Sequence, residues 1–200
     1  MHYFPGDIEP DSNWRSNLFV DTSWNIGFGG FGFGDGDDST YIQGVTSFFL
    51  RHTFSITNQE EIISLILHAD YDDAFIAYIN GVEVARSNNI YGTPPDYNAL
   101  ATSEHEALIY RNKLHEKYII DNALIDSILH IGDNVLAIQI HDVDSVPDDM
   151  SASFFFHAGI NSDSIVVSFP FLSVPVNIFH ILFEREKETQ LELLSLNFIS

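Results

Sequence analysis

The stretch YDDAFIAYINGVEVARSNN, residues 71–89, decides the fold. On both sides of Asn80 and Gly81 lie short runs rich in β-branched and aromatic residues, which are typical of β-strands. Asn-Gly supplies the positive φ angles that a two-residue type I′ turn needs. The stretch therefore predicts a β-hairpin over residues 74–86.

Other segments carry the same signals, each bounded by Gly, Asp, Asn or Pro. In the segment DNVLAIQIHDV, Leu136, Ile138 and Ile140 share one face, while Gln139 and His141 share the other. This alternation predicts a strand that buries one face. Further predicted elements are strands at 47–56, 61–70 and 133–143, and a short helical turn at 121–131.

The composition of the 200-residue chain favours a packed, acidic protein. Hydrophobic residues make up 45% of the chain, with 17 Phe and 8 Tyr, which is ample for a core. Against 29 acidic residues stand only 8 basic ones, and the net charge of −21 disfavours nucleic acid and anionic membrane surfaces as partners. The absence of cysteine excludes disulfides, zinc-thiolate sites and thiol catalysis.

We expect one sandwich domain at 1–162 and a C-terminal extension at 163–200. In the extension, a β-hairpin turning at 184–188 is favoured over a helix, because Pro170 and Pro175 interrupt the first half and both flanks alternate. The apolar run 165–183 contains the same prolines and is not predicted to span a membrane. No signal peptide is visible at the start, MHYFPGDIEP, so we expect a removed leader or a fragment.

Three motifs in a recurring order resemble a known family. They are R-x-x-F at Arg51 and Phe54, D-D-x-x-x-x-Y-x-N-G at 72–81, and G-x-N-x-L-A at 132–137. The chain resembles the galactose-binding-like jelly-roll modules of secreted multidomain bacterial proteins. It is also similar to the N-terminal sugar-binding jelly roll of β-galactosidase-type glycoside hydrolases.

The resemblance covers roughly residues 12–160. It departs at Ala74, where the family usually has Gly, and it has no counterpart for the tail after about 162. It implies an all-β fold of two antiparallel sheets, a jelly-roll sandwich, often with a structural calcium ion and often binding carbohydrate. It does not imply catalysis, because such jelly rolls also serve as spacers.

Three interpretations of Asp72 and Asp73 are open. Aspartates cap backbone N–H groups in turns, and they also bind ligand hydroxyls or calcium. A catalytic pair is disfavoured, because glycosidase carboxylates lie about 5 to 9 Å apart around one substrate. Adjacent strand residues point to opposite faces instead. We therefore assign Asp72 and Asp73 to the scaffold or to ligand binding.

An acidic turn, GDGDDST, offers a calcium site at Asp35, Asp37 and Asp38. Calcium takes six to eight oxygens, and a glycine-flexed acidic turn supplies them readily. The turn is not an EF-hand, because the twelfth position is Thr46 and not Glu. A solvated acidic turn is the alternative. A second acidic loop at 141–149, which the resemblance places at one end of the sandwich, would complete such a site.

Loop residues after the hairpin are the candidates for sugar recognition. Tyrosine rings stack on sugars, while arginine and asparagine donate paired hydrogen bonds. A long polar loop exposes such residues. Arg86, Asn88, Tyr91 and Tyr97 are the candidates from this part of the chain. Together with Asp72 and Asp73, which precede the hairpin, they form the predicted ligand-binding set.

Catalytic motifs are absent from the sequence. No H-E-x-x-H or G-x-S-x-G occurs. His68, His130 and His157 lie in apolar runs and are interpreted as semi-buried structural histidines.

The sequence predicts a non-catalytic carbohydrate-binding or adhesion module of a secreted or cell-surface protein, stabilised by Ca²⁺. Its expected partners are a polysaccharide or glycan and neighbouring domains of a larger polypeptide. A purely structural spacer is the alternative. An enzyme using Asp72 or His141 ranks last.

Overall fold

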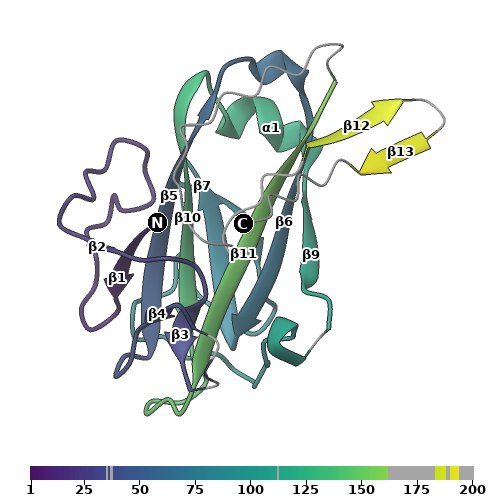
Figure 1. Ribbon diagram of the computed structural model, residues 1–200. Helices are drawn as coiled ribbons and strands as arrows, with labels where there is room; N and C mark the ends of the chain where they lie inside the picture. Colours follow the sequence, from purple (N-terminus) through teal and green to yellow (C-terminus); the bar gives the residue numbers. More distant parts are fainter. Residues whose placement is uncertain (35, 37, 112, 162–182, 188–189, 194–200) are drawn as a thin grey trace.

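The computed structural model describes residues 1–34, 36, 38–111, 113–161, 183–187 and 190–193. Two β-sheets pack face to face (Figure 1). This arrangement confirms the predicted all-β sandwich. No helix in the described ranges is long and apolar enough to cross a membrane.

One sheet has six strands in the order β2-β1-β5-β10-β7-β8, and every neighbouring pair in it is antiparallel. Its strands are β1 (His2–Pro5), β2 (Asn25–Ile26), β5 (Ser47–Ile56), β7 (Ala74–Ile79), β8 (Val82–Arg86) and β10 (Gly132–His141). The predicted strands at 47–56 and 133–143 thus become β5 and β10.

The second sheet has seven strands. Its long centre is β6 (Ile62–Asp72) paired with β11 (Met150–Ile160), and β9 (Glu116–Ile120) flanks β6. The remaining strands are β3 (Phe31–Phe33), β4 (Thr40–Tyr41), β12 (Phe183–Lys187) and β13 (Gln190–Leu193). Two pairings, β3–β4 and β11–β12, are parallel, so this sheet is mixed.

Three short helices complete the described chain: η1 (Gln59–Glu61), η2 (Ile109–Arg111) and α1 (Asn122–Ile128). The helical turn predicted at 121–131 is confirmed by α1, whose N-cap is Asp121. In the tail, β12 and β13 pair antiparallel. The division of the chain at 162 stays a prediction, and residues 162–182 lie outside the described part.

Strand alternation builds the main core between the sheets. On β10, Leu136, Ile138 and Ile140 point into it, and on β7 Phe75 and Ile79 do the same. The faces predicted for β10 are therefore confirmed. On the opposite sheet, alternate residues of β6 and β11 fill the other side of this core.

A second apolar cluster covers the outer face of the six-stranded sheet. Trp14 and Trp24 stack on each other, and Trp14 also packs edge-on against Phe49 and Tyr78. Loop residues 90–101 extend this cover. The prediction that β10 buries only one face is therefore wrong: its outer face lies under two long loops, whose presence strand alternation does not reveal.

The hairpin turn is confirmed by its backbone. Asn80 and Gly81 have φ angles of 50° and 89°, which suit Asn and Gly. The Asn80 side chain donates to Ile128 O and Asn134 Oδ1, and accepts from Val135 N–H. The turn is thus locked to the start of β10 and the end of α1.

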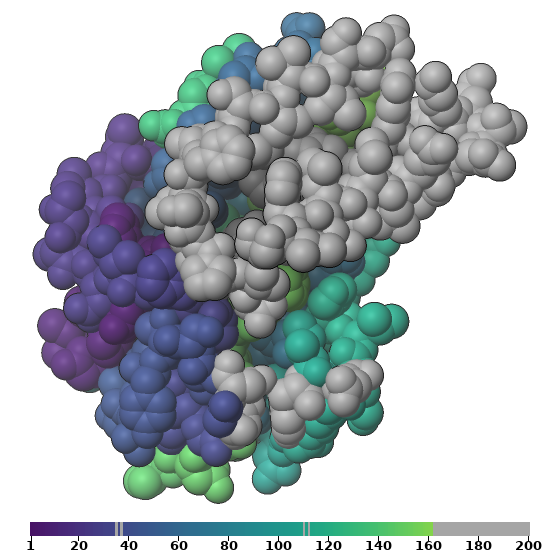
Figure 2. Space-filling view, in the orientation of Figure 1, coloured from purple at the N-terminus to yellow at the C-terminus, as the bar shows by residue number. Residues whose placement is uncertain are grey.

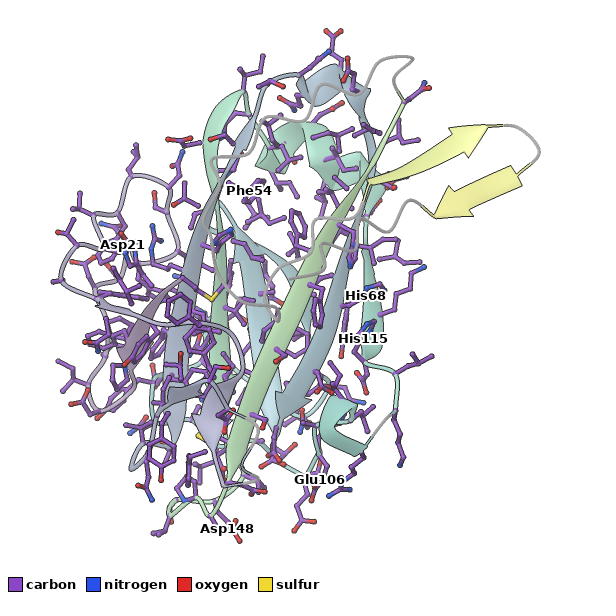
Figure 3. All side chains as sticks on the ribbon, viewed as in Figure 1. Asp21, Phe54, His68, Glu106, His115 and Asp148 are labelled. Atoms are coloured by element: carbon purple, nitrogen blue, oxygen red, sulfur yellow. The ribbon has the colours of Figure 1, made fainter. Side chains whose placement is uncertain are left out.

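At the opposite end of the sandwich, four segments gather: the β6–β7 junction, the loop 87–108, the β10–β11 loop and the β3–β4 turn. Figure 3 shows Glu106 and Asp148 at this end. In Figure 2 the β10–β11 loop forms the lower tip of the molecule. The candidate site lies among these segments.

Candidate metal centre

Three aspartates bring their carboxylate oxygens within 4.8 Å of one another: Asp72, Asp73 and Asp142. Asp72 ends β6, Asp73 lies between β6 and β7, and Asp142 follows β10. Their exposed fractions are only 7%, 5% and 3%. The three side chains, here called the carboxylate cluster, are therefore shielded from solvent at the loop end of the sandwich.

The expectation that Asp72 and Asp73 diverge is wrong. That expectation assumed a regular strand, but β6 ends at Asp72 and β7 begins at Ala74. Asp73 occupies the bend between them, so the period of two does not apply to it.

Asp73 is held by backbone donors from two loops. Its Oδ1 accepts from His105 N–H at 2.6 Å, and its Oδ2 accepts from Val143 N–H at 2.8 Å. The Asn89 side chain donates to its carbonyl oxygen at 3.2 Å and to Ser103 O at 2.8 Å. Asp73 thereby fastens the loop 87–108 and the β10–β11 loop to one point.

Asp142 is held mainly through its backbone. Its N–H donates to Thr46 O, and its carbonyl oxygen accepts from Ala101 N–H. Its Oδ1 accepts from Asp144 N–H at 2.5 Å. Burial raises the pKa of Asp142 to about 6, and the charges of Asp73, Asp144 and Asp149 add to the rise.

Asp72 has the most perturbed carboxyl group of the cluster. Burial raises its pKa to about 9, with further contributions from the negative charges of Asp73, Asp149, Glu106 and Asp142. Its carboxylate makes no hydrogen bond to the described residues. Burial and the neighbouring negative charges disfavour its ionised form, so this carboxyl group favours binding a proton or a cation.

No basic side chain of the described ranges forms an ion pair with the cluster. Glu106, whose charge acts on Asp72, is paired with Arg111. Within the described ranges, the cluster therefore combines negative charge and burial with no ion pair of its own.

These residues fit a calcium ion. Calcium prefers six to eight oxygen ligands and accepts monodentate or bidentate carboxylates. Each carboxylate oxygen that accepts one N–H keeps a lone pair for a cation. Asp72, Asp73 and Asp142 would hold the ion, which would neutralise most of their charge.

The calcium site at the turn of Asp35, Asp37 and Asp38 stays a prediction. Asp35 and Asp37 lie outside the described residues. Asp38 packs over Gly32, where a Cβ atom would come within 2.8 Å of Asp38 Oδ1. In the sheet, Gly32 pairs with Ser151, and Ser151 pairs with Asp72.

Arg86 and Tyr91 form one local unit. The Arg86 guanidinium makes a bidentate pair with Glu83 and donates to Ile90 O and Gly92 O. Four of its five N–H donors are thus used within the chain. These two carbonyls flank Tyr91, which is 73% exposed. Arg86 therefore positions Tyr91 for display to solvent.

The other two predicted ligand residues differ in exposure. Asn88 is exposed on the turn before Asn89. Tyr97 is half-buried and packs against the second apolar cluster, while its N–H donates to Glu9. Among the predicted set, only Asp72 and Asp73 meet within the cluster.

Sequence reasoning left Asp142 out of the ligand set, although it placed Asp142 in a second acidic loop. The signal was the position of Asp142 directly after a buried strand. The antiparallel pairing of His141 with Ala74 brings this position next to Asp73.

No family model matches the chain, and no curated protein sequence is similar to it. Solved structures show partial similarity. The β-glucuronidase 2 of Bacteroides uniformis, covalently bound to cyclophellitol-6-carboxylate aziridine, matches 76% of this chain at 12% identity and a TM-score of 0.45. The α-L-rhamnosidase of Streptomyces avermitilis, complexed with L-rhamnose, matches 59% at 18% identity and a TM-score of 0.37. A β-glycosidase from Bacteroides vulgatus matches 70% at 15% identity and a TM-score of 0.37.

This chain spans only a small part of those enzymes: 17% of the β-glucuronidase, 9% of the rhamnosidase and 16% of the β-glycosidase. At these identities and TM-scores no site residue carries over. The likeness to galactose-binding-like modules stays a resemblance in sequence.

Proposed function

We propose that this chain is a non-catalytic, calcium-stabilised carbohydrate-binding module of a secreted or cell-surface protein. The observation that carries the proposal is the carboxylate cluster: three buried aspartates lie together with no ion pair among the described residues, and burial raises the pKa of Asp72 and Asp142. A cation would favour the ionised form of these two carboxyl groups. Free calcium is abundant outside the cell, where weak calcium sites of extracellular modules function.

The ion's role in this proposal is to fix the loops. Asp73 joins the loop 87–108 to the β10–β11 loop, and Asp142 joins residues 46 and 101. Neutralising these carboxylates would stabilise the contacts between the loops. The segment that displays Asn88 and Tyr91 would then be held rigid, and a rigid site loses less entropy on binding.

The carbohydrate part rests on Tyr91 and its supports. An exposed tyrosine ring offers an apolar face for stacking on a sugar ring. The two carbonyls beside it are fixed by Arg86, so the ring is presented from a defined backbone. Asn88 adds an exposed amide on the same loop.

The surroundings of the enzyme candidates support a non-catalytic role. His141 is fully buried, and its Nδ1 lies 2.7 Å from Ala99 O, to which a neutral ring donates. Burial lowers the pKa of His141 to about 4, so the ring is neutral near pH 7. Asp72 is also shielded, and a glycosidase carboxylate must reach its substrate.

The experiment is affinity electrophoresis in gels that contain a panel of polysaccharides, with calcium and with EDTA. The proposal predicts calcium-dependent retardation in at least one gel. Tyr91→Ala is expected to weaken it by roughly two- to tenfold, the contribution of one aromatic contact. The matched control is Tyr41→Ala, which removes a ring with a comparable exposed fraction, 64%, from β4.

If Tyr91→Ala and Tyr41→Ala were both retarded as strongly as the parent chain, Tyr91 would not be part of the binding site. A full panel with no retardation would contradict carbohydrate binding and favour a spacer that positions neighbouring domains of a larger polypeptide.

A further inference from the structure

Three histidines meet on the outer face of the seven-stranded sheet, away from the carboxylate cluster. His68 comes from β6, His157 from β11, and His115 from the residue before β9. Their side chains share a face because β6 lies between β9 and β11. Figure 3 shows His68 and His115 next to each other beside β6 and β9.

His68 and His157 are already at ligand spacing. Their Nδ1 and Nε2 atoms are 2.9 Å apart, and one ring donates to the other. Two nitrogens that bind one tetrahedral zinc ion at 2.0–2.1 Å lie about 3.3 Å apart. If the distance between the two nitrogens increased by a few tenths of an ångström, both could therefore bind one ion.

His115 supplies a third nitrogen. Its ring stacks on that of His68, with 4.3 Å between the centroids. Its Nδ1 is buried and has no hydrogen-bond partner among the described residues. The three nitrogens do not converge in the present rotamers, so His115 must turn to complete the site. The unsatisfied nitrogen favours this turn, since a buried polar atom without a partner is costly.

The protonation state also suits a metal ligand. A hydrogen bond between two imidazoles requires one of them to be neutral. Imidazole prefers zinc and neighbouring transition metals, whereas calcium takes oxygen ligands.

We propose that His68, His157 and His115 form a second metal site, for a zinc-class transition-metal dication. The site is separate from the carboxylate cluster in position and in donor chemistry. It does not rest on the proposed function.

The test is zinc titration by calorimetry in excess calcium, so that oxygen-rich sites are filled with the harder ion. The expected result is one zinc ion per chain. The substitutions His68→Gln and His115→Gln, at part-exposed positions, are expected to weaken binding by at least about tenfold, since even indirect ligand supports contribute 10–100-fold. His157→Gln is expected to act alike, but His157 is only 8% exposed and its loss can also affect folding.

Two controls separate binding from folding. His105→Gln removes a histidine that bonds to Glu116, the first residue of β9, and that is not one of the three proposed ligands, so it should leave the zinc affinity unchanged. Cobalt absorption supplies a second readout, because the visible bands of a tetrahedral nitrogen site disappear in His68→Gln even if the fold is retained. Zinc binding that is absent in the parent chain, or equal in the parent, His68→Gln and His115→Gln, would overturn the proposal.

Discussion

Asp73 and Val143 are seventy residues apart in the chain and are joined by a 2.8 Å hydrogen bond from the Val143 N–H to the Asp73 carboxylate. The other carboxylate oxygen of Asp73 accepts from His105 N–H. One side chain thus links the β6–β7 bend to both long loops at this end of the sandwich. The carboxylate cluster is the consequence, because these links place Asp142 beside Asp72 and Asp73.

Asp73→Asn tests the structural part of this arrangement. The amide keeps the volume but replaces one acceptor oxygen with a donor, so it can accept only one of the two N–H groups. We expect a loss of about 1.5–3 kcal/mol in the free energy of unfolding, the usual contribution of a hydrogen bond to a charged group. Urea denaturation in EDTA measures it. Asp144→Asn, at an exposed position, serves as the control, and equal losses in the two variants would contradict the special role of Asp73.

The raised pKa of Asp72 makes the stability of the calcium-free chain depend on pH. Its pKa in the folded chain, about 9, lies above the ordinary value of 3.8, so the folded chain holds a proton that the unfolded chain has lost. Stability therefore falls as the pH rises toward about 9, by at most about 1.4 kcal/mol per pH unit.

Below about pH 6.5 the buried His141 acts in the opposite direction. Its pKa in the folded chain is about 4, so the unfolded chain binds the proton first, and stability falls as the pH falls. Between about pH 5 and 6.5 the two effects offset each other, so thermal melts in EDTA should show the steeper fall in stability between about pH 7 and 9, where Asp72 acts without His141. Asp72→Asn should remove this alkaline slope and raise the melting temperature at about pH 8; an unchanged alkaline slope would rule out Asp72 as its origin.

Calcium binding is expected to release a proton. Near pH 7.5 most Asp72 carboxyls are protonated in the ion-free chain, and an ion must displace that proton. Calorimetry in buffers of different ionisation enthalpy should report about one proton released per ion. The release should disappear in Asp72→Asn. Binding enthalpies that do not depend on the buffer would contradict the pKa assigned to Asp72.

Arg51 tests the second apolar cluster. It is only 3% exposed, pairs with Asp21 at 2.9 Å, and donates to the carbonyls of Trp14, Ser16 and Phe19. Arg51→Ala leaves Asp21 and these carbonyls without their donor, and we expect a loss of about 3–5 kcal/mol. Chemical denaturation measures the loss.

The control for Arg51 is Arg111→Ala. Its ion pair with Glu106 is about half exposed, so the expected loss is about 0–1 kcal/mol. If the two variants lost similar amounts of unfolding free energy, the buried hydrogen bonds of Arg51 would not contribute more to stability than an exposed ion pair.

The sequence predicted the strands well, because alternation and the Asn80-Gly81 turn are local signals. It could not show that both faces of β10 are buried, since the covering residues Trp14 and Ile90 lie far away in the chain. The carboxylate cluster also depends on contacts between residues that are far apart in the chain. Asp72 and Asp73 are visible as a pair, but Asp142 joins them only through strand pairing. His68, His115 and His157 carry no motif and meet only because β9, β6 and β11 are neighbours.

The most direct test of the carboxylate cluster is the calcium dependence of the melting temperature in the parent chain and in Asp142→Asn. At a hundredfold excess over its dissociation constant, calcium should stabilise the parent chain by about 2.7 kcal/mol, or about 5–10 °C. Asp142→Asn should lose most of that shift, whereas Asp144→Asn should keep it. A parent chain that melts at the same temperature in calcium and in EDTA would contradict the account.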